Sequence, residues 1–350
     1  MRAATLHGQE SLHTRGTSMT PLPRKRILTA TLRDSLARRP FIDTKLDQLR
    51  GRMESLRFST PTHRNERTNL FFIIGSGRSG TTLLRRILMS SQDVYIPPEL
   101  QGLPTSIRWY RRHAHMDWES LVTGCLAFVQ FHSTFEHARA DLTPFYQAMR
   151  KAPERDRSLC YLLSGLYRYL AHVDGRDGAY LYGDKTPGLT AHAYRVLSVF
   201  PDAKFVHVLR DPFDVACSFA HSNLRPLEDA AALWVHRTRS ARKLVSSHPE
   251  RCLTVRYEEL VTDPRAVASR VSNFIGLRSS RGLDVDAVEH LPAMRDGSLS
   301  HHQRLDQPVT STRVGIARAA LDRDQLARLE RIVGKEARRW DYADSAPHAG

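Results

Sequence analysis

The sequence predicts an α/β fold of three layers, in which helices cover both faces of a central parallel β-sheet. Apolar segments of strand length alternate with longer segments of helical periodicity, and this alternation is typical of parallel strands joined by crossover helices. The segments at residues 69–74 and 204–209 are the richest in large apolar and β-branched residues, which indicates strands buried on both faces. With 350 residues, 41% of them hydrophobic, the chain can form one large domain with a full core.

The expected elements follow one another from residue 69 onward. Strands are expected at residues 69–74, 179–182, 204–209 and 252–256, and helices at residues 81–90, 191–200, 212–222, 227–247 and 264–275. Residues 100–176 contain no clear strand and are expected to form several helices. Residues 278–312 show no periodicity and are expected to be an irregular loop. Asp322 or Asp324 then caps a final helix that ends near Arg339.

Residues 1–67 differ from the remainder of the chain in charge. They carry 14 Lys and Arg against 6 Asp and Glu. The difference, a net charge of +8, is more than half of the formal net charge of +15 for the whole chain. Apolar residues at helical spacing predict one amphipathic helix in this part, with Ile42, Leu46, Leu49, Met53 and Leu56 on one face. We expect a basic, partly disordered extension suited to peripheral association with an anionic surface. A domain at residues 68–342 and a flexible tail at residues 343–350 follow it.

The net charge of +15 favours an anionic ligand, such as a phosphorylated cofactor, an acidic polymer or a nucleic acid. No segment reaches the roughly 20 apolar residues of a membrane span, and the N-terminus lacks the apolar core of a secretory signal peptide. The four cysteines lie far apart and have no histidine at zinc-binding spacing; they are Cys125, Cys160, Cys217 and Cys252. We therefore expect reduced cysteines and a cytoplasmic protein.

A glycine-rich segment lies between the first expected strand and the first expected helix. It reads Gly75-Ser76-Gly77-Arg78-Ser79-Gly80-Thr81-Thr82. A loop in this position binds anions, because its backbone N–H groups and the positive end of the helix converge on one point. The spacing of Gly75 and Gly80 matches a Walker A loop, but Thr81 stands where such a loop has its lysine. The cation of this loop is Arg78.

The loop resembles the 5'-phosphosulfate loop of sulfotransferases, which use 3'-phosphoadenosine 5'-phosphosulfate (PAPS). The resemblance implies a P-loop-like fold and a donor site in which the loop residues hold the 5' end of PAPS. These residues are Gly77, Arg78, Ser79, Gly80, Thr81 and Thr82. The arginine form of the loop is similar to the carbohydrate, tyrosylprotein and bacterial branches of the family.

Three later segments extend the resemblance. Arg210 ends a strand and Ser218 lies eight residues further on, in the next helix, which is the family's 3'-phosphate pair. Tyr257 follows another strand in a turn whose tyrosine approaches the nucleotide in the family. Arg313 and Gly315 are similar to the Arg-x-Gly of the late loop that closes over the 3'-phosphate.

Sulfuryl transfer needs a base for the acceptor hydroxyl and positive charge near the transferring group. The resemblance places the base at Glu99, and it places a lysine that reaches the transferring group at Lys185, with Arg78 as a further cation. Cytosolic sulfotransferases use a histidine instead, and four histidines remain alternative candidates for the base: His132, His137, His301 and His302. The helical region 100–176 is expected to bind the acceptor, a hydroxyl on a glycan, lipid, natural product or protein tyrosine.

Two other classes of function remain as alternatives. A P-loop kinase or other phosphotransferase would need the Walker lysine and an aspartate for Mg²⁺, for which Asp211 is a weak substitute. A non-catalytic protein that binds polyanions or nucleic acid would account for the charge, but the sequence contains no zinc finger, RNP string or clear helix-turn-helix. The favoured reading is a PAPS-dependent enzyme that needs no metal and binds no specific nucleic acid.

Overall fold

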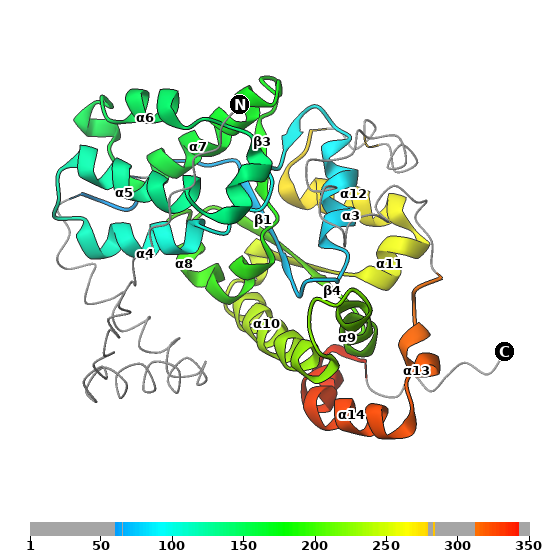
Figure 1. Cartoon of the computed structure of the whole chain (residues 1–350). Coiled ribbons are helices and arrows are strands. Elements are labelled where there is room, and N and C mark those ends of the chain that lie inside the picture. The colour runs from blue at the N-terminus through cyan, green and yellow to red at the C-terminus, as the bar shows by residue number, and fades with distance from the viewer. Residues whose placement is uncertain (1–59, 65, 279–282, 284–311, 343–350) are drawn as a thin grey trace, which may run out of the picture. The chain divides into compact units, whose positions relative to one another are not determined.

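The structure is a computed structural model that describes residues 60–64, 66–278, 283 and 312–342 (Figure 1). Several expectations fall outside these residues. They are the amphipathic helix of the N-terminal extension, most of the irregular loop at 278–312 with His301 and His302, and the tail at 343–350.

A parallel sheet of five strands forms the centre of the domain, in the order β2-β3-β1-β4-β5. The strands are β1 (Leu70–Gly75), β2 (Val94–Tyr95), β3 (Leu181–Asp184), β4 (Lys204–Leu209) and β5 (Cys252–Arg256). Every pairing in the sheet is parallel. The predicted α/β class and central parallel sheet are confirmed.

Alternate residues of β1 point to opposite faces and divide the core into two clusters. Phe71 and Ile73 belong to one cluster, and Phe72 and Ile74 belong to the other. The first face is covered by α3 (Thr81–Met89), α11 (Tyr257–Thr262) and α12 (Pro264–Ile275). The second is covered by α4 (Leu103–His113), α5 (Trp118–Gln130), α6 (Thr143–Met149), α7 (Leu159–Val173), α8 (Ala193–Leu197) and α10 (Leu227–Ser247). The predicted three layers are therefore present (Figure 1).

A third apolar cluster lies beyond the carboxyl end of β4. It is formed by α9 (Pro212–His221), α13 (Ile316–Ala320), α14 (Arg323–Ala337) and the first half of α10. Asp322 caps α14 in a capping box with Gln325, as one of the two sequence alternatives predicted. No helix in the described part of the chain is long and apolar enough to cross a membrane.

Four expected elements have the predicted bounds, three differ by one residue at one or both ends, and others differ for local reasons. The sequence missed β2, because two residues are too few to show periodicity. It placed β3 two residues early, since Ala179 belongs to a turn in which its N–H donates to the Arg176 carbonyl. The single helix expected at 191–200 is a 3-10 segment, Pro187–His192, followed by the short α8.

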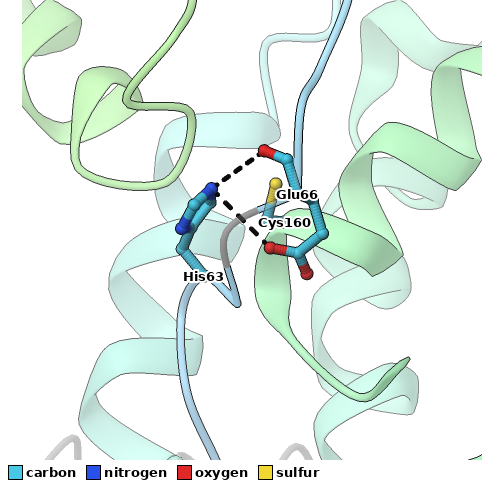
Figure 2. A group of neighbouring side chains, drawn as sticks. All are labelled: His63, Glu66 and Cys160. Carbon is cyan, nitrogen blue, oxygen red and sulfur yellow. Dashed lines mark hydrogen bonds and ion pairs between the residues drawn. The ribbon is translucent and has the colours of Figure 1, made fainter. Parts of the chain in front are cut away.

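The segment before β1 is attached to the amino end of α7 (Figure 2). The Glu66 carboxylate accepts a hydrogen bond from the Ser158 hydroxyl, the N-cap of α7. The His63 ring nitrogen Nε2 lies 3.0 Å from the Glu66 carbonyl oxygen. One side-chain nitrogen, oxygen or sulfur atom from each of His63, Glu66 and Cys160 lies within 4.8 Å of the other two. These contacts join His63 and Glu66 to the helical layer.

The topology places the loop after β1 at the centre of one sheet edge. The chain leaves β1 for β2 and β3 on one side, and then crosses to β4 on the other. Ligands of open α/β sheets bind at such a switch point, outside the carboxyl ends of the strands. Phe72 pairs with Asp184 of β3 and Gly75 pairs with Val208 of β4, so the ends of the three strands meet there.

Candidate active site

The loop at residues 75–82 has the geometry of an anion cradle. Helix α3 begins at Thr81, and no side chain caps the N–H groups of its first turn. The hydroxyl oxygens of Ser76 and Ser79 are buried and have no hydrogen-bond partner among the described residues. Free backbone N–H groups at a helix N-terminus, with unpartnered buried hydroxyls beside them, fit a phosphate or sulfate group.

Two glycines of the loop are required by close contacts and by backbone conformation. Gly80 has φ +90°, and a Cβ there would lie 2.4 Å from the ring of Tyr257. A Cβ on Gly77 would lie 2.8 Å from the ring of Phe219. Tyr257, expected in a turn, is the buried first residue of α11, and its ring lies beside the loop.

The Thr190 side chain fixes the end of β1. Its hydroxyl accepts a hydrogen bond from the Gly75 N–H and donates one to the Gly75 carbonyl oxygen, both at 2.9 Å. Thr190 belongs to the 3-10 segment Pro187–His192 that follows β3. The contact therefore connects the end of β3 to the start of the loop.

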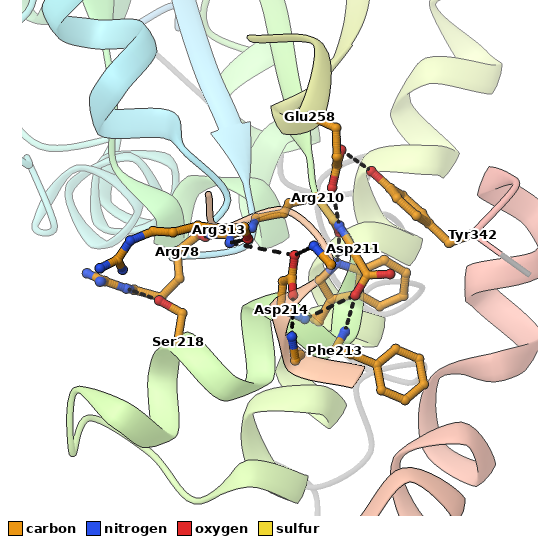
Figure 3. A network of polar contacts seen from close by, with 12 residues as sticks. Arg78, Arg210, Asp211, Phe213, Asp214, Ser218, Glu258, Arg313 and Tyr342 are labelled. Carbon is orange, nitrogen blue, oxygen red and sulfur yellow. Dashed lines mark hydrogen bonds and ion pairs between the residues drawn. The ribbon is translucent and has the colours of Figure 1, made fainter. Parts of the chain in front are cut away.

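Arg210 occupies the centre of a polar network at the end of β4 (Figure 3). Its guanidinium donates to the Arg78 carbonyl oxygen at 3.1 Å and to the Arg313 carbonyl oxygen at 2.8 Å. It also lies 3.7 Å from the Asp214 carboxylate and 4.1 Å from the centre of the Tyr257 ring. Nε of Arg210 is buried without a hydrogen-bond partner among the described residues. The network joins segments that are far apart in the sequence.

Arg78 and Ser218 contact each other directly. Nε of Arg78 donates to the Ser218 hydroxyl at 3.0 Å. Arg78 has φ +66°, a left-handed conformation that is rare outside glycine and that occurs at functional sites. In Figure 3 the side chains of Arg78 and Arg313 lie on the same side of the network as Ser218. A residue expected to hold the 5' end of PAPS and one expected to hold its 3'-phosphate therefore lie next to each other.

Glu99 and Lys185 form an ion pair at the end of β3. Nζ of Lys185 lies 2.7 Å from one carboxylate oxygen of Glu99, and the Gln101 amide donates to the other at 2.7 Å. The Lys185 side chain is 1% exposed, whereas the Glu99 side chain is 25% exposed. A carboxylate that is partly open to solvent therefore lies next to a buried cation.

Neighbouring elements hold this pair in position. The Thr186 hydroxyl accepts from the Leu100 N–H, and the Thr134 hydroxyl donates to the Glu99 carbonyl oxygen. Asp184 lies just before the lysine and accepts a hydrogen bond from Tyr167. Burial raises the pKa of Asp184 to about 6. Although Asp184 directly precedes Lys185 in the sequence, the carboxylate that Nζ of this lysine contacts at 2.7 Å is that of Glu99.

Two of the four alternative candidates for the base, His132 and His137, lie in the described part of the chain. His132 contacts the Thr134 hydroxyl at 3.0 Å, and Thr134 in turn contacts the Glu99 backbone. His137 is half-buried in the following 3-10 segment, Ser133–Ala138. Phe131, next to His132, is 85% exposed.

Asp211 serves as a helix cap. Its carboxylate accepts from the N–H groups of Phe213 and Asp214 at the start of α9. Burial raises the pKa of Asp211 to about 6. A carboxylate committed to two backbone N–H groups is poorly suited to hold Mg²⁺, which weakens the phosphotransferase alternative.

The sequence reasoning missed two residues of this region. Asp214 pairs with Arg210 and accepts from the N–H groups of Gly315 and Ala317, so it fixes the late loop. Arg237, on α10, lies beside Gly77 of the loop: a Cβ on that glycine would be 3.5 Å from Nη1 of Arg237. The only sequence signal for Arg237 was its place one turn after Trp234, on the expected inner face of a long helix.

Comparisons with known proteins identify the family. A family model described as "Sulfotransferase family" matches residues 71–281, which is more than half of the chain. The chain therefore belongs to the sulfotransferase family, and it is an enzyme that transfers a sulfuryl group. This is the class that the sequence resemblance predicted.

Two relatives illustrate the similarity. A protein of Caenorhabditis briggsae described as "Putative protein-tyrosine sulfotransferase" is 24% identical over 219 residues, which cover 61% of this chain and 67% of that protein. Among solved structures, the sulfotransferase domain of the olefin synthase of Synechococcus PCC 7002 matches with a TM-score of 0.52 and 24% identity. The match covers 79% of this chain and 98% of that domain. The structural match supports the predicted P-loop-like sulfotransferase fold.

Proposed function

We propose that the enzyme transfers the sulfuryl group of PAPS to a hydroxyl acceptor, with Glu99 as the base. One observation carries this proposal: a partly exposed carboxylate is paired with a buried lysine, Lys185, at the same sheet edge as an anion cradle. The cradle suits the phosphosulfate, and the pair suits the proton transfer. No histidine in the described part of the chain has an equivalent position.

Buried polar atoms support the assignment of the donor site. Ser76 Oγ, Ser79 Oγ and Arg210 Nε lack hydrogen-bond partners among the described residues, and an anionic ligand with two separate phosphates would supply acceptors for them. The loop and the N–H groups of α3 would hold the 5' end. Arg210, Ser218 and the loop of Arg313 and Gly315 would hold the 3'-phosphate, and Tyr257 would contact the nucleotide.

The residues of the pair have distinct roles in this reaction. PAPS supplies an activated sulfuryl group, whose bond to the 5'-phosphate breaks while the acceptor oxygen bonds to sulfur. Glu99 accepts the proton of the acceptor hydroxyl at the oxygen that Gln101 now contacts. Lys185 orients Glu99 and provides positive charge beside the transferring group, and Arg78 provides charge from within the loop. Lys185 and Arg78, the two cations, do work that a metal ion performs in phosphoryl-transfer enzymes.

The acceptor would approach from the helical region 100–176. Phe131 exposes its ring one residue before His132, which is connected to Glu99 through Thr134. This neighbourhood suits a hydroxyl on a molecule with an apolar part, such as a lipid, a natural product, a glycan conjugate or a protein tyrosine. The four cysteines are all free, which fits a reducing compartment such as the cytoplasm.

Transfer of labelled sulfate tests the proposal. The full chain is incubated with radiolabelled PAPS and with phenolic, sugar and aliphatic alcohols, and both labelled product and released 3'-phosphoadenosine 5'-phosphate (PAP) are measured. We expect both to form in parallel with at least one class of alcohol. Adenosine 5'-phosphosulfate, which lacks the 3'-phosphate, should be a much poorer donor, and equal use of the two donors would contradict the assignment of the 3' site.

A further inference from the structure

Helix α10 places one more arginine beside the loop at residues 75–82. The indole N–H of Trp234 donates to the Arg210 carbonyl oxygen at 3.0 Å, so this face of α10 packs against the end of β4. Arg237 lies three residues further on and therefore on the same face. Its Nη1 would lie 3.5 Å from a Cβ built on Gly77, so the guanidinium is beside this loop glycine.

Arg237 differs from Arg78 and Arg210, because its side chain makes no hydrogen bond or ion pair with any residue that the structure describes. Arg78 donates to Ser218, and Arg210 donates to two carbonyl oxygens and lies near Asp214. Burial lowers the pKa of Arg237 to about 10, with the charge of Arg225 as a second cause, while Glu99 acts in the opposite direction. A half-buried cation of this kind needs an anion to offset its desolvation.

Two groups indicate which anion Arg237 binds: the loop glycine beside its guanidinium and the carboxylate whose charge acts on its pKa. Gly77 belongs to the cradle that would hold the 5'-phosphosulfate, and Glu99 is the group that would take the proton of the acceptor. In the proposed reaction the sulfuryl group passes from the first of these positions towards the second. The residues proposed for the 3'-phosphate, Arg210 and Ser218, contact Arg78.

We infer that Arg237 is a third cation of the reaction, a catalytic residue that contacts the oxygens of the transferring sulfuryl group. The inference rests on the proposed function. In the step, the bond between sulfur and the 5'-phosphate oxygen breaks and PAP leaves with the electron pair. The acceptor oxygen forms the new bond to sulfur, and its proton goes to Glu99. Arg237 exchanges no atoms, and it stabilises the negative charge on the sulfuryl oxygens throughout.

The dissociation constants of PAP and PAPS for the Arg237→Gln variant distinguish a contact with the sulfuryl group from a contact with another part of the donor. PAP lacks the sulfuryl group, so its dissociation constant should change by less than about threefold. That of PAPS should rise about tenfold or more, the usual effect of losing a hydrogen bond to a charged group. Arg237→Lys keeps the charge and should recover part of the affinity for PAPS. Arg239→Gln removes the same charge two residues along α10, where Arg239 faces Glu336, and should change neither constant.

Calorimetry with purified full chains gives the constants, and the melting temperature of each variant shows whether it is folded. A second readout is the slow transfer of the sulfuryl group to water, followed as PAP release, which should fall at least tenfold in Arg237→Gln. If both ligands lose affinity equally, or if neither ligand nor rate changes, Arg237 does not contact the sulfuryl group. If the wild-type chain binds neither ligand, the proposed donor itself is wrong, so the two failures can be distinguished.

Discussion

Replacing Glu99 with glutamine changes the proposed base while keeping its size. The Gln side chain retains an oxygen that can accept from Lys185, but it cannot take up the acceptor proton. Loss of a general base lowers turnover by roughly 10²–10⁴-fold. PAP affinity should stay within about threefold of the wild-type value, because Glu99 contacts the lysine and Gln101 and belongs to neither phosphate site.

The stability of Glu99→Gln should fall measurably. Lys185 is buried and exchanges a charged partner for a neutral one; removing one partner of a buried ion pair costs about 3–5 kcal/mol, which the hydrogen bond retained by Gln offsets only in part. Urea unfolding followed by fluorescence measures this difference. Lys185→Ala should behave differently, because it also removes positive charge near the donor and should lower both turnover and donor affinity.

Turnover is assayed with radiolabelled PAPS and any acceptor that the wild-type chain sulfates. Glu136→Gln is the matched control, since it removes an exposed carboxylate from the 3-10 segment next to Glu99 and should leave turnover unchanged. Near wild-type turnover in Glu99→Gln would refute the reasoning. The base would then be a histidine, and His132, connected to Glu99 through Thr134, would be the first to replace.

Two further predictions concern the donor site. Arg210→Ala should weaken binding of PAP by about 1.5–3 kcal/mol more than binding of adenosine 5'-phosphosulfate, because Arg210 is proposed to contact the 3'-phosphate; equal losses in calorimetry would show that it does not. Gly80→Ala should lower the free energy of unfolding by about 1–3 kcal/mol and weaken PAP binding as well, because its φ is +90° and the Tyr257 ring would have to move. Gly178→Ala is the control for it, since a Cβ at that position meets nothing within 4 Å, and a Gly80→Ala variant as stable as this control would contradict the argument.

The contiguous features of the site could be predicted from the sequence. The loop at residues 75–82 lies on a single strand–loop–helix segment, where local spacing determines geometry. The bounds of β4, β5, α10 and α12 were predictable for the same reason, since their apolar periodicity is strong. The pairing of Arg210 with Ser218 at one phosphate stays a prediction, and in the structure the Ser218 hydroxyl contacts Arg78. The family resemblance added the candidates Glu99 and Lys185.

Contacts between distant segments could not be predicted in this way. Glu99 and Lys185 are 86 residues apart, and their pairing depends on how the loop after β2 packs against the end of β3. Arg237 lies beside the loop only because α10 packs across the end of β4, and its place one turn after Trp234 is the only local signal for it. The contact between Arg78 and Ser218 likewise joins two predicted phosphate sites that the sequence treated separately.

The most direct test of the central claim compares PAP with ATP as stabilising ligands of the full chain. A ligand at about 100 times its dissociation constant adds roughly 2.7 kcal/mol to the free energy of unfolding. We predict that PAP raises the melting temperature to match such a gain, because the loop and the Arg210 network can each hold one of its phosphates. ATP with Mg²⁺ should raise it far less, since the loop has Thr81 in place of the Walker lysine. Equal stabilisation by ATP, or none by PAP, would contradict a PAPS-dependent sulfotransferase.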